Sequence, residues 1–173
     1  GLGHQIIFII GDATGVIGDT SDKESERPML SEEEVKDNLK NYLIQVGKII
    51  DINKCEVRYN SEWLDKLGYR EIGKQADRFS LNEFNSRENI SKRLESGKRV
   101  SLRESFYPLM QGYDSVAVKS DVEIGGTDQR FNLLAGRELQ RMYNQEPQDI
   151  IMNELIEGLD GRKMSSSWGN TIN

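Results

Sequence analysis

Short apolar runs along the chain predict strands, and they are separated by longer segments with helical spacing. Residues 5–10 form an apolar run bounded by Gly3 and Gly11. A run of this kind is typical of a strand buried on both faces, as in a parallel sheet. Shorter segments with strand-like composition follow at 55–59, 121–124 and 148–152.

Serine capping boxes mark the start of two predicted helices. Ser31 and Glu34 form one S-x-x-E box, and Ser101 and Glu104 form another. Apolar residues recur at threes and fours after the first box as far as Ile50. The second box opens a helix predicted to run to about residue 119.

A third long helix is predicted over 128–143, and the polar segment 12–28 is expected to be a loop. Strands that alternate with helices of more than ten residues predict an α/β fold with a parallel sheet covered on both faces. Residues 63–100 differ, because they combine short helical stretches with much charge and no obvious strand. They are expected to form a small helical insertion between residues 1–62 and 101–173.

Charge and composition narrow the function classes. The 173 residues include 23 Lys and Arg, 29 Asp and Glu, one His and one Cys, with a formal net charge of −6. This balance argues against a free-standing nucleic-acid binder, although nucleic acid held mainly by another domain stays open. A single Cys excludes a disulfide framework within the chain, and a structural zinc site is not expected. No apolar run is long enough to cross a bilayer.

Three loops that follow predicted strands carry candidate chemistry, because ligands of parallel sheets bind beyond the carboxyl ends of the strands. The first loop, residues 11–19, has three glycines that allow close backbone approach, and Asp19 can accept hydrogen bonds from an amino group. It matches neither a dinucleotide fingerprint nor a P-loop. A tight turn with an Asp cap is the alternative.

The other two loops have the same ambiguity. In the second, Gly125 and Gly126 precede a helix start at which Asp128 can bond a ribose, although simple capping by Thr127 or Asp128 explains the same residues. In the third, Lys163 and the serines that follow suit an anion such as pyrophosphate. A solvated surface loop would have the same composition.

The helix after Ser101 gives a sharper signal. Its predicted core stripe contains Leu102, Phe106, Leu109, Tyr113 and Val116. A phenol, an amide and a carboxylate follow one position round from that stripe, and they are Tyr107, Gln111 and Asp114. Polar groups at such an edge are partly desolvated and need partners, so they can surround a small polar ligand. An ordinary helix flank is the alternative.

Together these motifs, in this order and spacing, resemble the bacterial tyrosyl-tRNA synthetases over essentially the whole chain. The quoted series is 13–19 (ATGVIGD), 60–63 (NSEW), Tyr107-x-x-x-Gln111-x-x-Asp114, 125–129 (GGTDQ) and 163–167 (KMSSS). The resemblance implies a class I synthetase with a Rossmann-like domain split by a helical connective insertion. It also implies ATP-dependent activation of L-tyrosine to tyrosyl-adenylate and transfer to tRNA(Tyr).

The same resemblance implies roles for individual residues. Tyr107, Gln111 and Asp19 would hold the tyrosine ammonium group, and Asp114 would read the phenol hydroxyl. The remaining residues implied for the tyrosine pocket are Thr14, Asn60 and Glu123. Those implied for ATP are Gly125, Gly126, Asp128, Lys163 and Met164. The implied catalytic residues are Gln129, beside the reacting carboxylate, with Lys163 and Ser166 in the loop that steadies pyrophosphate.

Departures from the family pattern modify these expectations. Ser166 stands where the KMSKS motif has its second Lys, and Glu123 occupies a place often held by Gln. The HIGH motif is absent, so the chain is expected to be a catalytic-domain fragment that also lacks the tRNA-binding C-terminal domains and is inactive alone. ATP would enter with Mg²⁺ as substrate, with no tightly bound cofactor and no protein metal site.

The remaining expectations concern partners and rival functions. The family implies a cytoplasmic homodimer that pairs through the connective insertion, with no membrane partner, and tRNA(Tyr) bound mainly through regions outside these residues. One alternative is a catalytically dead synthetase-like module that binds tyrosine or a partner protein. Another is tryptophanyl-tRNA synthetase, against which the Tyr107–Gln111–Asp114 spacing speaks because an indole offers Asp114 no hydroxyl.

Overall fold

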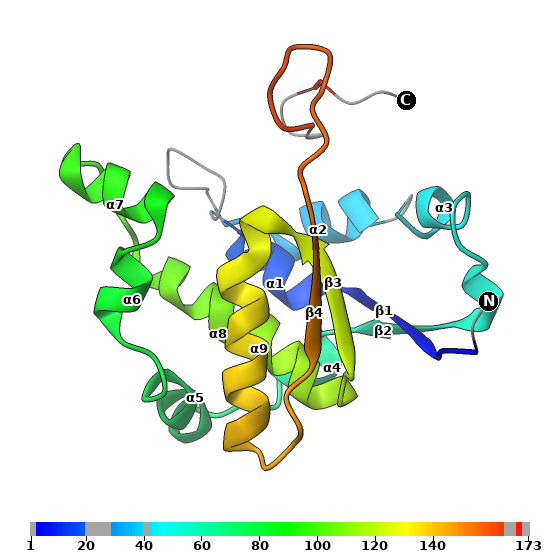
Figure 1. Ribbon diagram of the computed structural model, residues 1–173, viewed down its shortest axis with the longest axis horizontal. Helices are drawn as coiled ribbons and strands as arrows, with labels where there is room; N and C mark the ends of the chain where they lie inside the picture. Colours follow the sequence, from blue (N-terminus) through cyan, green and yellow to red (C-terminus); the bar gives the residue numbers. More distant parts are fainter. Residues whose placement is uncertain (1–2, 20–28, 40–41, 165–168, 171–173) are drawn as a thin grey trace.

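A computed structural model describes residues 3–19, 29–39, 42–164 and 169–170 (Figure 1). Its strands pair in parallel, two by two, within this described part. They are β1 (Ile6–Ile10), β2 (Cys55–Tyr59), β3 (Val122–Gly126) and β4 (Asp149–Asn153). The predicted strands and their parallel direction are therefore confirmed, with β1–β2 and β3–β4 forming two separate two-stranded sheets.

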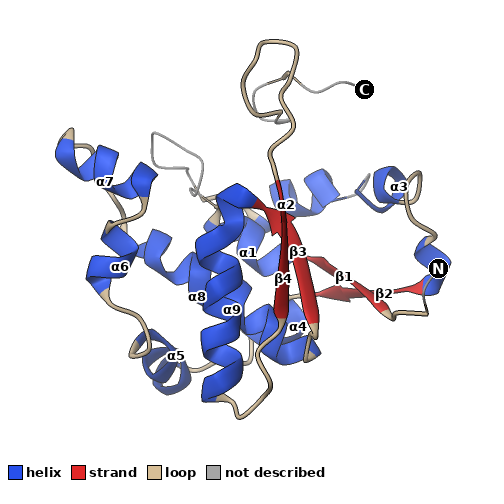
Figure 2. Cartoon of the chain, in the orientation of Figure 1, coloured by secondary structure: helices blue, strands red, loops and turns tan. Residues whose placement is uncertain are grey.

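Helices occupy most of the rest of the described chain (Figure 2). The first part contains α1 (Asp12–Ile17), α2 (Glu32–Leu39), α3 (Tyr42–Val46), the short 3₁₀ turn η1 (Ile52–Lys54) and α4 (Ser61–Leu64). Residues 63–100 contain no strand and continue with α5 (Tyr69–Ala76), α6 (Leu81–Asn85) and α7 (Glu88–Glu95). The last part contains α8 (Leu102–Val118), η2 (Thr127–Gln129) and α9 (Arg130–Met142).

Both predicted capping boxes form. The backbone N–H of Ser31 donates to Glu34 Oε2 at 2.7 Å, and Glu34 N–H donates to Ser31 Oγ at 3.2 Å. At the start of α8, Ser101 N–H donates to Glu104 Oε1 at 2.8 Å, and the full box is present. Each box satisfies backbone donors that the first helical turn leaves without intrahelical partners, so local sequence suffices to place these two helix starts.

The loop expected over residues 12–28 was wrong for its first part, which forms α1. Gly15 N–H donates to Gly11 O at 2.8 Å and closes the first helical turn. A Cβ added at Gly15 would lie 3.1 Å from Val35 Cγ1, so this glycine lets α1 pack closely against α2. Tertiary packing has therefore overridden the local preference of a glycine-rich segment.

Two other boundaries differ from expectation. Gly125 and Gly126 continue β3 and pair with Met152 and Asn153 instead of forming a turn, and α9 begins at Arg130 after the 3₁₀ turn η2. The apolar spacing after Ser31 covers α2 and α3, and residues 40–41 between them lie outside the described part of the chain. Periodicity locates the elements well but not where each helix begins and ends.

Helices α8 and α9 pack closely against each other. A Cβ at Gly112 would lie 3.0 Å from the backbone of Ala135 and Gly136, so the two helices approach closely at this point. Buried apolar residues around this contact form the core together with side chains from β1, α2, α4, α6 and α7, namely Ile10, Val35, Trp63, Leu64, Phe84, Ile90, Leu109, Val116, Leu133, Ala135 and Leu139.

The predicted core stripe of α8 holds only in part. Leu109 and Val116 are buried, but Leu102 is 69% exposed and Phe106 is 38% exposed. The stripe prediction was therefore wrong at Leu102 and Phe106.

Candidate active site

The carboxyl ends of β1 and β2 meet at one edge, because these strands are parallel and paired in register from Ile6–Cys55 to Ile10–Tyr59. Asn60 follows β2 directly and is completely buried. Its Oδ1 accepts from Ala13 N–H at 3.0 Å, while its Nδ2 donates to Thr14 Oγ1 at 3.0 Å. One amide side chain thus ties the end of β2 to the first turn of α1.

Asp12 also holds this edge of the sheet in place. Its Oδ1 accepts from the backbone N–H groups of Ala13 at 2.9 Å and Ser61 at 3.0 Å, and its Oδ2 accepts from Ser61 Oγ at 2.6 Å. The carboxylate therefore supplies acceptors at the starts of both α1 and α4, where free N–H groups favour negative charge. These contacts fix the positions of Thr14 and Asn60 relative to each other.

Asp114 on α8 reaches the same cluster and is buried. Trp63 Nε1 donates to Asp114 Oδ1 at 2.7 Å, and Asn60 Nδ2 donates to Asp114 Oδ2 at 3.3 Å. Burial raises the pKa of Asp114 to about 7; the two hydrogen bonds oppose this rise, and the nearby carboxyls of Glu123 and Asp12 reinforce it. Asp114 is thus a carboxyl whose protonation state changes near neutral pH, in a buried polar cluster built by α1, α4, α8 and the end of β2.

A chain of side-chain amides runs from α8 to the second motif. Asn132 Nδ2 donates to Gln111 Oε1 at 3.0 Å and to Gln129 Oε1 at 2.9 Å. Gln129 Nε2 in turn donates to Asp19 Oδ2 at 2.8 Å. The structure therefore brings together Gln111, Gln129 and Asp19, which come from three separate sequence motifs.

An ion pair joins the second motif to the third. Lys163 Nζ lies 2.5 Å from Asp128 Oδ2, although 35 residues separate them in sequence. Met164 is held beside this pair because its N–H donates to Ile156 O at 2.7 Å. The segment that carries Lys163 leaves the end of β4 and projects from the body of the molecule (Figure 1). Ser166 lies outside the described residues.

The glycines of the second motif allow this close approach. A Cβ at Gly126 would lie 2.5 Å from Asp128 Oδ1 and 3.0 Å from Leu155 Cδ2. A Cβ at Gly125 would lie 3.1 Å from Leu133 Cδ1. Both positions therefore need the absence of a side chain, so that β3 can pass close to η2 and α9.

Tyr107 and Glu123 complete the set of predicted residues. Tyr107 is half-buried on α8, one turn before Gln111. Glu123 on β3 accepts from Ser115 Oγ at 3.0 Å and from Gln148 Nε2. Burial raises the pKa of Glu123, while hydrogen bonds from Gln148, Ser115 and Gln111 oppose the rise.

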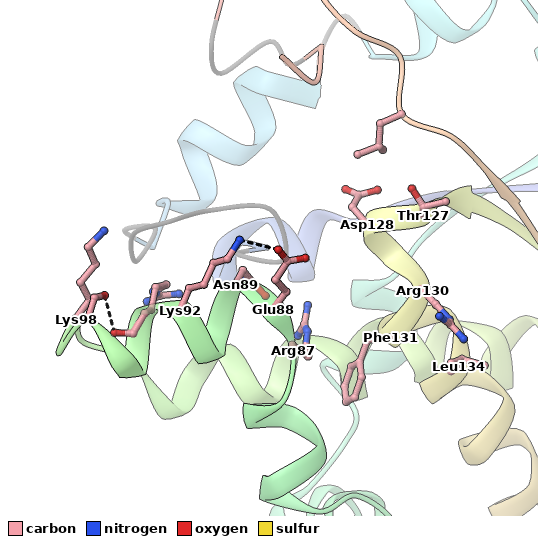
Figure 3. Close-up of a pocket in the computed structure, with 13 residues that line it drawn as sticks. Arg87, Glu88, Asn89, Lys92, Lys98, Thr127, Asp128, Arg130, Phe131 and Leu134 are labelled. Carbon is pink, nitrogen blue, oxygen red and sulfur yellow. Dashed lines mark hydrogen bonds and ion pairs between the residues drawn. The ribbon is translucent and has the colours of Figure 1, made fainter. Parts of the chain in front are cut away.

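A cavity of about 850 Å³ opens beside Asp128, between α7 of the insertion and the start of α9 (Figure 3). We call it the basic cavity, because the charged residues that line it are mostly cations. Its lining residues are Arg87, Glu88, Asn89, Lys92, Arg93, Ser96, Lys98, Thr127, Asp128, Arg130, Phe131, Leu134 and Leu155. Their charges form a local positive region on an acidic chain.

Arg87 and Arg93 fix the wall of the basic cavity. The guanidinium of Arg87 lies 4.9 Å from the ring centroid of Phe131 and 5.6 Å from that of Phe84, and burial lowers its pKa. Arg93 is completely buried and forms two hydrogen bonds with Glu104, at 2.6 and 3.0 Å. The insertion is thus anchored to α8 by an ion pair and to α9 by a cation–π contact.

The sequence patterns above do not identify three contributors to this site. Asn132 connects Gln111 to Gln129, Trp63 is one of the two donors to Asp114, and Asp12 orders the strand ends. Asn132 follows Gln129 by three residues, a spacing that places them on one helix face, and that spacing is the signal that identifies Asn132. The partners of Trp63 and Asp12 lie 51 and 49 residues away, so local sequence carries no signal for them.

Among residues 3–19, 29–39, 42–164 and 169–170, no group of three or more His, Cys, Asp or Glu side chains is arranged to hold a metal ion. A search of the same residues finds no helix with the length and apolar character needed to span a membrane.

Comparison of the sequence with family models identifies the class of protein to which this fold and site belong. The family model described as tRNA synthetases class I (W and Y) matches residues 2–173. The chain belongs to this family.

Individual relatives narrow the similarity. The chain is 51% identical over 172 residues to the tyrosine–tRNA ligase of Ralstonia nicotianae, covering 99% of the chain and 44% of that protein. It is 52% identical over 172 residues to the tyrosine–tRNA ligase of Carboxydothermus hydrogenoformans, covering 99% and 42%. The chain therefore spans less than half the length of the curated relatives that it matches.

Solved structures with the same fold come from both branches of the family. A tyrosyl-tRNA synthetase of Archaeoglobus fulgidus complexed with L-tyrosine has a TM-score of 0.70 at 24% identity, covering 97% of this chain and 50% of that one. A tryptophanyl-tRNA synthetase of Campylobacter jejuni has a TM-score of 0.69 at 18% identity, covering 99% and 53%. These likenesses confirm the Rossmann-like fold class and do not distinguish the two substrates.

Proposed function

We propose that this chain is part of an enzyme that activates L-tyrosine with ATP to tyrosyl-adenylate and transfers the tyrosyl group to tRNA(Tyr). The observation that carries the proposal is the continuous path of contacts from Gln111 through Asn132 and Gln129, with Asp128 and Lys163 beside it. This path joins the residues proposed for tyrosine to those proposed for ATP. The tyrosine–tRNA ligases at about 51% identity support the same reading.

Tyrosine would be recognised at both of its polar ends. Asp19 and the Gln111 oxygen offer acceptors for the ammonium group, with Tyr107 one helical turn away. Asp114 would accept from, or donate to, the phenol hydroxyl. Trp63 and Asn60 already hold that carboxyl in place, while Thr14 and Glu123 would line the pocket. A buried partner of this kind penalises phenylalanine heavily, because phenylalanine leaves it unpaired.

ATP would bind across the second and third motifs as its Mg²⁺ complex, so the metal arrives with the nucleotide. Asp128 would accept from ribose hydroxyls, and Gly125 and Gly126 would contribute by letting η2 and α9 lie close to β3. Lys163 would move from Asp128 to the phosphates and oppose the charge that builds on leaving pyrophosphate, with Met164 beside it. The loop serines, including Ser166, would assist there as donors.

The reaction needs no nucleophilic side chain from the protein. The tyrosine carboxylate itself attacks the α-phosphorus of ATP, the bond to the bridging oxygen breaks, and pyrophosphate leaves. Gln129 donates to Asp19 and lies between the amide chain and Asp128, where it would orient the reacting carboxylate. Catalysis is then positioning together with electrostatic stabilisation of the transition state.

The basic cavity supports the transfer step. Its cations and the apolar side chains of Phe131 and Leu134 suit the phosphates and bases of a single-stranded RNA end, and the cavity borders Asp128. We place the 3′ end of tRNA(Tyr) there, with most of the tRNA bound by regions outside these residues. These local cations make an RNA substrate compatible with the net charge of −6.

The assembly is proposed from exposed apolar residues. Tyr69 is 95% exposed, Leu81 64% and Leu102 69%, and all three lie on or next to the insertion. Covering them with a second copy of the chain would form a homodimer through residues 63–100, as the family resemblance implies. We propose a cytoplasmic location for the enzyme, as the same resemblance implies.

The direct test is tyrosine-dependent exchange of pyrophosphate into ATP, measured with the longest natural polypeptide that contains these residues. Exchange with tyrosine and not with tryptophan is expected, whereas exchange with tryptophan would identify the other branch of the family. Asp114→Ala should lower the preference for tyrosine over phenylalanine by about a hundredfold, because the unpaired-partner penalty is lost. An unchanged preference would contradict the pocket assignment.

A second function is favoured by the replacement of the motif lysine by Ser166. A synthetase-like module would bind tyrosine without activating it. Tyrosine would then raise the melting temperature, since a ligand of the native state stabilises it, while exchange would be absent even in the longest polypeptide. The isolated 173 residues are expected to show negligible exchange in either case.

A further inference from the structure

Asn132 is a buried polar residue in the first turn of α9, and helix packing fixes its position. It is 1% exposed. A Cβ at Gly112 on α8 would lie 3.0 Å from the backbone nitrogen of Gly136 on α9, so the two helices approach closely one turn after Asn132. This approach brings Gln111, the neighbour of Gly112, within reach of the Asn132 side chain.

The side chain of Asn132 joins two other amides through a single nitrogen. Asn132 Nδ2 donates to Gln111 Oε1 at 3.0 Å and to Gln129 Oε1 at 2.9 Å. An amide NH₂ group has two hydrogens, so these two bonds use both of them. A carbonyl oxygen has two lone pairs, so Gln111 Oε1 can accept from a ligand while it accepts from Asn132.

The orientation of this chain of amides is set at its acidic end. Gln129 Nε2 donates to Asp19 Oδ2 at 2.8 Å and to Asp128 Oδ2 at 3.4 Å. A carboxylate only accepts, so the Gln129 NH₂ group faces these acids and its oxygen faces Asn132. Asn132 therefore presents its NH₂ group to that oxygen, and the same group orients the oxygen of Gln111.

A second observation points to a missing donor at this place. Asn132 Oδ1 is buried and has no hydrogen-bond partner among the residues that the structure describes. Buried acceptors in proteins are normally satisfied, so an open one on a side chain bonded to Gln111 is the expected environment of a ligand that brings N–H donors. An ammonium group provides three.

We infer that Asn132 helps to bind the amino group of the substrate: its NH₂ group positions the Gln111 oxygen as one acceptor, and its own Oδ1 supplies another. This rests on the proposed amino-acid activation. Without the Asn132 donor, the Gln111 amide could turn and present NH₂ to the ammonium, so that donor would face donor. Gln129 would keep its orientation, because Asp19 and Asp128 still accept from it. The effect therefore concerns binding of the amino group and not the chemical step.

The test compares L-tyrosine with its desamino analogue, 3-(4-hydroxyphenyl)propionate, in the longest natural polypeptide that contains these residues. Asn132→Ala should raise KM for tyrosine in pyrophosphate exchange about tenfold or more, with kcat changed less than about threefold. Inhibition by the analogue, which lacks the amino group, should change less than about twofold. The control is Gln75→Ala on α5, which removes another amide that is 1% exposed and donates to Tyr143 Oη at 3.0 Å. It should alter neither ligand.

A second substitution, at position 111, separates positioning from packing. A carboxylate presents oxygens in both orientations and needs no donor to orient it. In a Gln111→Glu background, Asn132→Ala should therefore raise KM by less than about threefold, whereas a loss of packing would cost the same in both backgrounds. Asn132→Ser keeps one donor and should show the same pattern with a smaller rise, so it carries the test if the alanine variant does not fold.

Three outcomes would overturn the inference and leave the proposed function intact. They are equal weakening of tyrosine and the analogue, an unchanged KM for tyrosine, and an equal cost of Asn132→Ala in both backgrounds. If the unaltered protein neither binds tyrosine nor exchanges pyrophosphate, the proposed function fails and the inference fails with it.

Discussion

Two regions with opposite character meet at Asp128: the proposed amino-acid pocket, a cluster made by Asp19, Gln111, Asp114, Glu123 and Asn132, and the basic cavity. The pocket residues are mostly buried carboxyls and amides, and each already has a hydrogen-bond partner within the protein. The cavity is open and lined by cations, several of which are exposed. Although the net charge is −6, negative and positive side chains are therefore separated locally. The acidic region suits an ammonium group, and the basic region suits phosphates.

The difference teaches that the two regions should respond to different perturbations. Exposed charges interact through water and salt, with a screening length of about 8 Å at physiological ionic strength. Buried carboxyls are screened much less, and their protonation depends on desolvation and hydrogen bonds. Removal of one partner of a buried ion pair, by contrast, mainly lowers the free energy of unfolding. The following predictions separate these cases, from the largest effect to the smallest.

The largest effect is expected where the wall of the basic cavity is itself buried. Arg93 and Glu104 are each 1% exposed and joined at 2.6 Å. Arg93→Leu leaves Glu104 charged, buried and without its cation, so the free energy of unfolding should fall by about 3–5 kcal/mol, measured by urea denaturation. Adding Glu104→Gln removes the stranded charge and keeps the α8 capping box, so part of the loss should return. A loss below about 1 kcal/mol in the single variant would contradict a stabilising role for this pair.

The next effect is a pH dependence that belongs to the amino-acid pocket. The pKa of Asp114 is raised to about 7 from 3.8, so between these values the folded state holds a proton that the unfolded state has lost. The contribution to stability is therefore full below pH 3.8 and is lost as pH rises to about 7. The slope approaches about 1.4 kcal/mol per pH unit between pH 5 and pH 6 and falls to about half of that at pH 7.

Asp114→Asn isolates this contribution. Unfolding free energies of both proteins should be compared from pH 5 to pH 8. The variant should lose most of the fall with pH, and a smaller slope in the same direction should remain, because burial also raises the pKa of Glu123. Identical pH profiles for the two proteins would show that Asp114 does not titrate in this range.

The smallest effect concerns the exposed cations of the basic cavity. Lys92 pairs with Glu88 at 2.6 Å, with side chains 71% and 82% exposed. Lys92→Gln should weaken tRNA binding only a few-fold and lower the dependence of log K on log salt by up to about 0.9, with tyrosine binding unchanged. The matched control is Lys54→Gln, because Lys54 also forms an exposed ion pair, with Asp51 at 2.9 Å, but does not line the cavity. If both variants showed the same salt dependence of tRNA binding, the basic cavity would not be a contact site for RNA.

Sequence reasoning was most successful where short-range chemistry decides. The capping boxes at Ser31 and Ser101 and the apolar strands need only neighbours a few residues away. The prediction of a loop failed around Gly15, because this segment forms a helix that packs against Val35. The same holds within the site: spacing groups Gln111 with Asp114, but the donors to Asp114 are Trp63 and Asn60, 51 and 54 residues earlier. Roles assigned to the site residues stay predictions until ligands are measured.

The sequence by itself determined the element order, the parallel strands, the motifs and their family, because these depend on local periodicity and on residue types at fixed spacing. Tertiary structure alone decided that Asn132 links Gln111 to Gln129, that Lys163 covers Asp128, and that cations gather in one cavity of an acidic chain. The physical reason is that hydrogen bonds and ion pairs are set by distance in space. Distance along the chain carries no information about contacts between groups that folding brings together.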